Sequence, residues 1–108
     1  MNCYEHTFIT KQGLTDSQIE KLVGKYEDIV NTNSGEVLKT EKWGLRILSD
    51  RIKNNKKGFY FHIKLKGIAK TIKELEKVQI IDATLIRYLT VKVKKHDLKT
   101  IYFAKKDS

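Results

Sequence analysis

The sequence predicts an α+β fold in which two helices pack on one face of a four-stranded antiparallel sheet. Two observations lead to this prediction. Strand-like and helix-like periodicities alternate in the order βαββαβ, and 108 residues suit a single domain of ordinary size. This is the ferredoxin-like arrangement, in which the first strand lies between the third and the fourth. We expect residues 1–95 to form the domain and residues 96–108 a basic C-terminal tail.

The first strand and the first helix have clear local signals. Residues 4–10 are rich in β-branched and aromatic side chains, which favour a strand. Thr15 and Gln18 then have the spacing of a capping box, and the turn-forming residues 31–35 end the helix. Between these limits, one apolar stripe repeats at helical intervals: Ile19, Leu22, Val23, Tyr26, Ile29 and Val30.

The second and third strands follow the helix. Residues 37–48 predict a strand, and Gly44 within it indicates a bulge or kink beside Trp43. The polar residues 50–57 predict a connection, and residues 58–66 predict the clearest strand of the chain. On that strand Phe59, Phe61, Ile63 and Leu65 alternate with Tyr60, His62, Lys64 and Lys66. The apolar set is expected to lie under the helices, which leaves the polar set on the open face of the sheet.

A second helix and a last strand complete the pattern. The apolar spacing from Ile68 to Val78 predicts the helix, and residues 86–94 predict the strand. We expect Leu89, Val91 and Val93 to lie under the helices. The open face would then combine the following aromatic and basic residues: Tyr60, His62, Lys64, Tyr88, Lys92 and Lys94.

Residues 57–64 approximate a signature of RNA-recognition motifs, which stack bases on exposed aromatic rings. Here the stacking positions would be Phe59 and Phe61. The alternate positions would then form the core, but they include His62 and Lys64, which are poor core residues. We therefore expect the faces to be reversed and the match to be accidental.

Charge is distributed unevenly along the chain. Residues 1–50 carry six Lys/Arg and eight Asp/Glu, a net of −2, whereas residues 51–108 carry sixteen and five, a net of +11. Such an excess attracts polyanions, of which phosphate backbones are the commonest. The alternative is a solvated lysine-rich surface without a partner.

Several classes of function lack their usual signals. One cysteine, Cys3, cannot form an internal disulfide, and three scattered histidines do not have the spacing of a metal site. No apolar stretch is long enough to cross a membrane, so we expect a soluble protein of the cytoplasm or of an organelle interior. His6 alternates with Tyr4 and Phe8, which favours a hydrogen-bonded inward histidine. We predict no enzymatic activity, no cofactor, no metal and no small-molecule substrate.

Two segments are more specific. Residues 41–48, EKWGLRIL, with Ile52 and Lys53 after them, resemble the G-x-R-x-L-A-Y-x-I-x-K stretch of the bacterial ribosomal protein S6 family of the small subunit. Residues 82–92, DATLIRYLTVK, resemble that family's final-strand pattern, D-x-x-V-L-R-x-L-x-V-R/K. Tyr4 and Glu5 match its first strand. Residues 49–51 depart from the family, which usually has Ala-Tyr-Pro there.

The resemblance implies a ribosomal protein that binds the central domain of small-subunit ribosomal RNA as a heterodimer with ribosomal protein S18, without enzymatic activity. The hypothesis assigns RNA-backbone contacts to five residues: Arg46, Lys53, Arg87, Lys92 and Lys94. It assigns the partner-protein face to Trp43, Tyr60, His62 and Tyr88, although Trp43 is equally compatible with the core.

Two other functions are compatible with the same topology. A regulatory ferredoxin-like domain would bind a small molecule and form homodimers through its sheet, but the sequence lacks an acidic or glycine-rich ligand loop. An acylphosphatase-like enzyme needs an arginine and an asparagine near a glycine-rich loop after the first strand. Residues 10–14, TKQGL, lack them.

Overall fold

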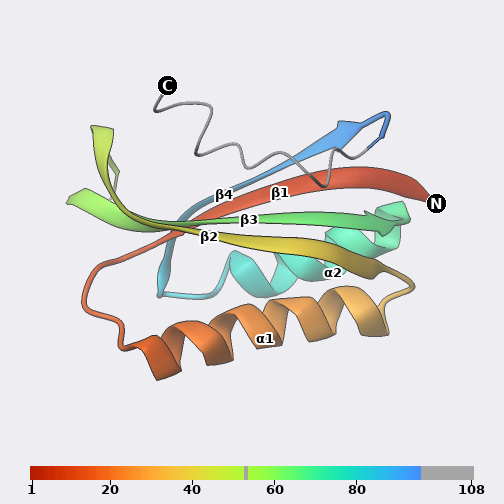
Figure 1. Ribbon diagram of the computed structural model, residues 1–108, viewed down its shortest axis with the longest axis horizontal. Helices are drawn as coiled ribbons and strands as arrows, with labels where there is room; N and C mark the ends of the chain where they lie inside the picture. Colours follow the sequence, from red (N-terminus) through yellow and green to blue (C-terminus); the bar gives the residue numbers. More distant parts are fainter. Residues whose placement is uncertain (53, 96–108) are drawn as a thin grey trace.

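The computed structural model describes residues 1–52 and 54–95. The elements follow the order β1 (Asn2–Thr10), α1 (Asp16–Thr32), β2 (Glu36–Ile52), β3 (Asn55–Gly67), α2 (Ala69–Gln79) and β4 (Leu85–Val93). The strands form one antiparallel sheet in the order β2-β3-β1-β4, and both helices lie on the same side of it (Figure 1). The predicted ferredoxin-like fold is confirmed. The expected basic tail, residues 96–108, lies outside the described residues.

The core lies between the helices and the inner faces of β1 and β3. Phe8 stacks on Phe61 with ring centroids 5.0 Å apart and meets the ring of Tyr26 edge-on at 5.2 Å. Because Phe61 is only 2% exposed, it cannot stack a base, and the rejection of the RNA-recognition motif is confirmed. The rest of the buried cluster is Ile19, Leu22, Val23, Val30, Ile63, Leu65, Leu75 and Leu85.

Local signals place α1 as the sequence predicts. The Thr15 hydroxyl accepts a hydrogen bond from the backbone N–H of Gln18 at 3.1 Å, and the Gln18 side chain accepts one from the backbone N–H of Thr15 at 2.9 Å. This reciprocal pair satisfies two amides that the helix leaves without intrahelical acceptors. The predicted capping box is confirmed.

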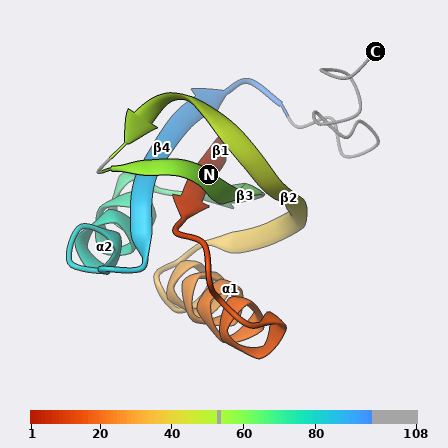
Figure 2. The same cartoon turned by 90° about the vertical axis from the view of Figure 1, so that its left-hand side faces the viewer.

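The β2–β3 hairpin is longer than predicted. The expected polar connection is a continuation of both strands, and the turn is tight, with Asn54 at φ 65°. Asparagine tolerates this left-handed conformation better than most residues. The hairpin end of β2 and β3 curls over the open face of the sheet (Figure 2), and Leu48 packs there against Ile9 and Ile86.

The prediction of the faces of β4 is wrong by one residue. Tyr88 lies opposite Phe8 and packs against the core on the helix side, so it is not on the open face. Lys92 lies opposite Tyr4, which also packs against that core. The open face instead receives Leu89, Val91 and Val93, the residues that apolar alternation had assigned to the core. Pairing with β1 decides the register here, and the large ring of Tyr88 fills the space beside Phe8.

His6 faces inward and is fully buried, as expected. Its Nδ1 lies 2.6 Å from the hydroxyl of Thr90, which in turn donates to Glu76 of α2 at 3.3 Å. Burial lowers the pKa of His6 from 6.5 to about 4, although Gln79 partly opposes this shift. At neutral pH the imidazole is therefore uncharged and part of the core.

Asp82 connects α1 to the turn before β4. Its Oδ2 accepts a hydrogen bond from the Tyr26 hydroxyl at 2.6 Å and lies 3.9 Å from Nζ of Lys25, while its Oδ1 accepts from the backbone N–H of Thr84 at 3.0 Å. Burial raises the pKa of Asp82, but the hydrogen bonds from Tyr26 and Thr84 outweigh burial, so the pKa is lowered overall. Asp82 is therefore a structural residue.

Replacing Asp82 with alanine should lower the free energy of unfolding by about 1–3 kcal/mol, because a part-buried tyrosine hydroxyl and a turn amide lose their acceptor. Urea denaturation would measure the loss. The double variant with Tyr26→Phe should lose less than the sum of the two single variants. Asp28→Ala, at an exposed position of α1, the helix that contains Tyr26, is the control. Additive losses would show that the two side chains do not interact.

His6 should make the protein less stable in acid. Because its folded pKa lies below the unfolded value of 6.5, the unfolded state binds the proton more readily, and stability falls as pH drops from 6.5 towards 4. The loss due to His6 alone should reach about 3 kcal/mol at the acid end. Urea denaturation at several pH values should show a flatter dependence for His6→Gln than for the native chain. Equal pH dependence would contradict this assignment.

Candidate nucleic-acid and partner-protein interface

The centre of the open face is a buried polar network. His62 lies with Nδ1 2.9 Å from the Thr7 hydroxyl and Nε2 3.4 Å from a Glu5 carboxylate oxygen. Lys64 is fully buried, with Nζ 3.9 Å from Glu41. Burial lowers the pKa of His62, although Glu5 and Glu41 oppose the shift. Glutamates thus neutralise the basic groups at the centre of this face, which leaves little net charge there for RNA.

Aromatic rings cover one side of this network. The β-bulge at Gly44, where φ is 86°, inserts Trp43 as an extra residue in β2, as the sequence predicted. Trp43 stacks on His62 with centroids 5.2 Å apart and on Tyr60 at 6.4 Å, and its Nε1 donates to Glu41 at 2.9 Å. Three of the four residues assigned to the partner face therefore lie together, and Tyr88 lies on the opposite side of the sheet.

The β4 side of the open face is apolar and exposed. Leu89 is 59% exposed and Val91 49% exposed, and both project from the same face as Arg87, which lies opposite Ile9. Sequence reasoning missed this pair because it assigned apolar alternation to the core. One signal could have shown the correct faces: Tyr88 is the only aromatic residue of β4, and it pairs with Phe8 of the core. Neighbouring exposed apolar side chains on a sheet suit contact with another protein.

The RNA candidates separate into two groups. Arg46 of β2 lies opposite Gly58 of β3, and Gly58 lies close to Ile9 and Ile86. Arg87 lies opposite Ile9, so Arg46 and Arg87 both belong to the hairpin end of the sheet. Lys92 and Lys94 lie at the other end, beside the N-terminus of the chain. Five residues of strand separate Arg87 from Lys92, which corresponds to about 17 Å. Lys53 lies outside the described residues.

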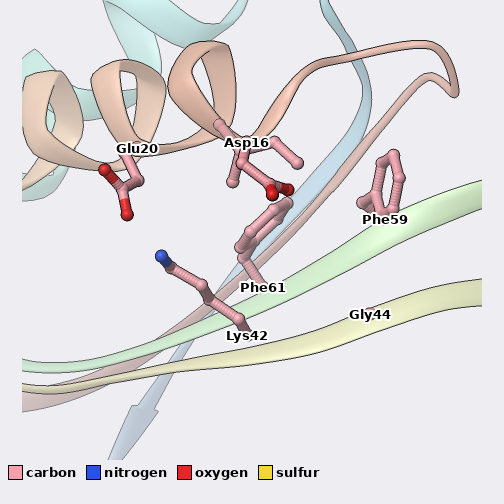
Figure 3. Close-up of a pocket in the computed structure, with 7 residues that line it drawn as sticks. Asp16, Glu20, Lys42, Gly44, Phe59 and Phe61 are labelled. Carbon is pink, nitrogen blue, oxygen red and sulfur yellow. The ribbon is translucent and has the colours of Figure 1, made fainter.

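A shallow pocket opens on the helix side, between α1 and the β2–β3 pair (Figure 3). Phe59 and Phe61 form its apolar floor, and Figure 3 shows the Lys42 ammonium directed towards Glu20 of α1, with the Asp16 carboxylate at another part of the rim. Asp16 lies in the first turn of α1, where the helix dipole favours an acid. Two carboxylates at the rim disfavour the binding of a phosphate in this pocket.

The described part of the chain also lacks other kinds of site. No cluster of three or more His, Cys, Asp or Glu within residues 1–52 and 54–95 has the arrangement of a metal site. No helix among these residues is long and apolar enough to span a membrane. The arrangement therefore offers binding surfaces: an aromatic and apolar sheet face between two basic ends.

Comparison with known proteins identifies the family. The Ribosomal protein S6 family matches the chain over residues 3–92. Small ribosomal subunit protein bS6 of Pelagibacter ubique is 52% identical over 107 residues, which cover 99% of this chain and 88% of that protein. The bS6 protein of Zymomonas mobilis is 39% identical over 97 residues, which cover 90% of this chain and 78% of that protein.

A solved structure agrees with this result. The crystal structure of 30S ribosomal protein S6 from Thermotoga maritima superimposes with a TM-score of 0.80 at 26% identity, covering 85% of this chain and 87% of that one. The resemblance that the two motifs carried is therefore confirmed in sequence and in fold. The chain belongs to the ribosomal protein S6 family of the small ribosomal subunit.

Proposed function

We propose that this protein binds the central domain of small-subunit ribosomal RNA as a heterodimer with ribosomal protein S18, and acts there as a structural constituent without enzymatic activity. The observation that carries the proposal is the family membership over residues 3–92. A net charge of +9 supports the RNA part, because phosphate neutralisation with counterion release is the main source of affinity for nucleic acids.

The two basic groups are the proposed RNA contacts. Arg87 is exposed on β4, and its guanidinium can grip a phosphate with two parallel hydrogen bonds. Lys92 and Lys94 are exposed at the end of the same strand and act as point charges. Arg46 is half-buried and donates from Nη2 to the backbone oxygen of Trp43 at 3.2 Å, so it also orients the bulge.

The open face between these groups is the proposed surface for S18. Leu89 and Val91 supply exposed apolar area, and the stack of Trp43, Tyr60 and His62 supplies flat rings beside it. Aromatic and apolar side chains are typical of the centre of a protein interface, where charged residues are depleted. Tyr88 is not part of this surface.

Sedimentation with small ribosomal subunits tests the proposal as a whole. Tagged protein should travel with the subunits at low salt, and together with S18 it should bind a central-domain RNA fragment. Protein that stays at the top of the gradient would contradict the ribosomal role. A stable homodimer in gel filtration would favour the regulatory domain that dimerises through its sheet.

Arg87→Ala and Lys92→Ala should weaken RNA binding in a salt-dependent way. Each lost phosphate contact should reduce the slope of log affinity against log salt by roughly 0.7–0.9. Filter binding of the heterodimer to the RNA fragment at several salt concentrations would measure this slope. Lys21→Ala, at an exposed position of α1, is the control. An unchanged slope in the Arg87 and Lys92 variants would remove these residues from the interface.

Replacing Leu89 and Val91 with serine should weaken the heterodimer by on the order of 2–4 kcal/mol, because two apolar side chains no longer become buried. Trp43 is the only tryptophan, so its fluorescence reports binding at the neighbouring stack. Ile80 and Ile81, 72% and 82% exposed in the turn after α2, provide a matched pair for the same substitutions. Equal losses of heterodimer affinity from both pairs would show that Leu89 and Val91 are not a specific part of the S18 surface.

A further inference from the structure

We propose that a second stretch of RNA phosphate backbone binds at a basic end of the molecule, where lysines from α2 join those of β3 and β4. This inference rests on the proposed function and adds residues that the family patterns do not include. The basic end consists of Lys66, Lys70, Lys73, Lys92 and Lys94.

The topology brings these lysines together from distant parts of the sequence. Cys3 of β1 pairs with Lys66 on one side and with Val93 on the other, so β3 and β4 both finish beside the start of β1. α2 begins two residues after β3 ends, at the same end of the sheet (Figure 1). The first turns of α2 therefore lie next to the last residues of two strands.

The contacts of α2 with β4 fix which lysines are neighbours. Glu76 is within hydrogen-bond distance of Thr90 at 3.3 Å, which places this part of the helix along the edge strand. Lys73 precedes Glu76 by three residues and therefore lies on the same helix face, one turn nearer the N-terminus of α2. Lys92 follows Thr90 by two residues on the same strand face, towards the same end. Lys73 and Lys92 are thus adjacent along this edge.

Acids lie near this end but form no ion pair with its lysines in the part of the chain that the structure describes: Glu36 lies opposite Lys66 in the β2–β3 pair, and Glu76 lies one turn from Lys73. Lys66, Lys70, Lys73 and Lys92 are all exposed and have no ion pair among the described residues. Two acids of α2 have other partners: Glu74 lies 3.9 Å from Lys77, and the Glu76 carboxylate accepts a hydrogen bond from the Thr90 hydroxyl at 3.3 Å. The centre of the open face differs, because there Glu41 lies beside the buried Lys64.

Two further points favour RNA over a protein or a merely solvated surface. The first turn of α2 contains Lys70 and no acid, whereas α1 has Asp16 in its first turn. Cations at the positive end of a helix dipole are unfavourable, and a bound polyanion would offset that repulsion. In addition, lysine is depleted in protein–protein interfaces but binds phosphate well as a point charge.

The test compares two double variants that remove the same charge. Lys70→Gln with Lys73→Gln alters the basic end, and Lys11→Gln with Lys21→Gln alters exposed positions outside it. Each is paired with S18 and titrated with a central-domain ribosomal RNA fragment at several salt concentrations. The first variant should bind about tenfold more weakly at low salt, with a slope smaller by about 1–2 because up to two phosphate contacts are lost. The second should retain nearly the native slope.

The other outcomes are decisive. If the native heterodimer does not bind the RNA, both the proposed function and this inference fail. If it binds and the two double variants behave alike, only the basic end is excluded, because net charge then explains the effect. If the Lys70 and Lys73 variant loses affinity for S18 but keeps its affinity for the RNA fragment, the surface is a protein contact and the inference is overturned. Thermal unfolding of each variant verifies that the fold is intact.

Discussion

The pairing of β1 with both β3 and β4 is the constraint on which the rest of the structure depends. Side chains alternate across a strand, so this register decides which residues of all three strands meet the helices and which lie on the open face. It directs Phe8 to the helix side and Glu5 to the open face. A shift of one residue would bring Glu5 into the apolar core and expose Phe8. The strong apolar preference of Phe8 and Phe61 therefore sets the chemistry of the opposite face as well.

One consequence is that a basic residue of the sequence does not always add positive charge to the surface. Lys64 belongs to the basic stretch from Arg51 to Lys73, yet it is fully buried and lies 3.9 Å from Glu41. A buried ammonium needs such a partner, because an unpaired charge in that position would be very costly. The neutral network leaves the middle of the sheet to aromatic and apolar contacts. The exposed basic residues proposed to contact RNA lie towards its two ends.

Local signals in the sequence predicted most of the fold. The Thr15 capping box, the bulge at Gly44 and the order of the six elements were all recoverable, because each depends on residues close in the chain. The faces of β4 were not, because Leu89 and Val91 have the alternation of a core strand and only pairing with β1 shows that they face outward. The hairpin was also underestimated, since a polar composition does not distinguish a loop from a strand that pairs at a sheet edge. The predicted placement of side chains was correspondingly partial: Trp43, Tyr60 and His62 do lie together, whereas Tyr88 lies on the helix side of the sheet.

The separation of the two basic groups has a physical consequence for assembly. Arg87 and Lys92 are about 17 Å apart along β4, which exceeds the Debye length of about 8 Å at physiological ionic strength. If both groups bind phosphates, as we propose, they do so nearly independently, and each contributes separately to the salt dependence of RNA binding. The apolar row of Leu89 and Val91 lies between them, and its contribution depends little on salt, because burial of apolar area does not rely on Coulomb attraction. The proposed function therefore implies a protein contact that persists over a range of ionic strength in which RNA affinity changes by orders of magnitude.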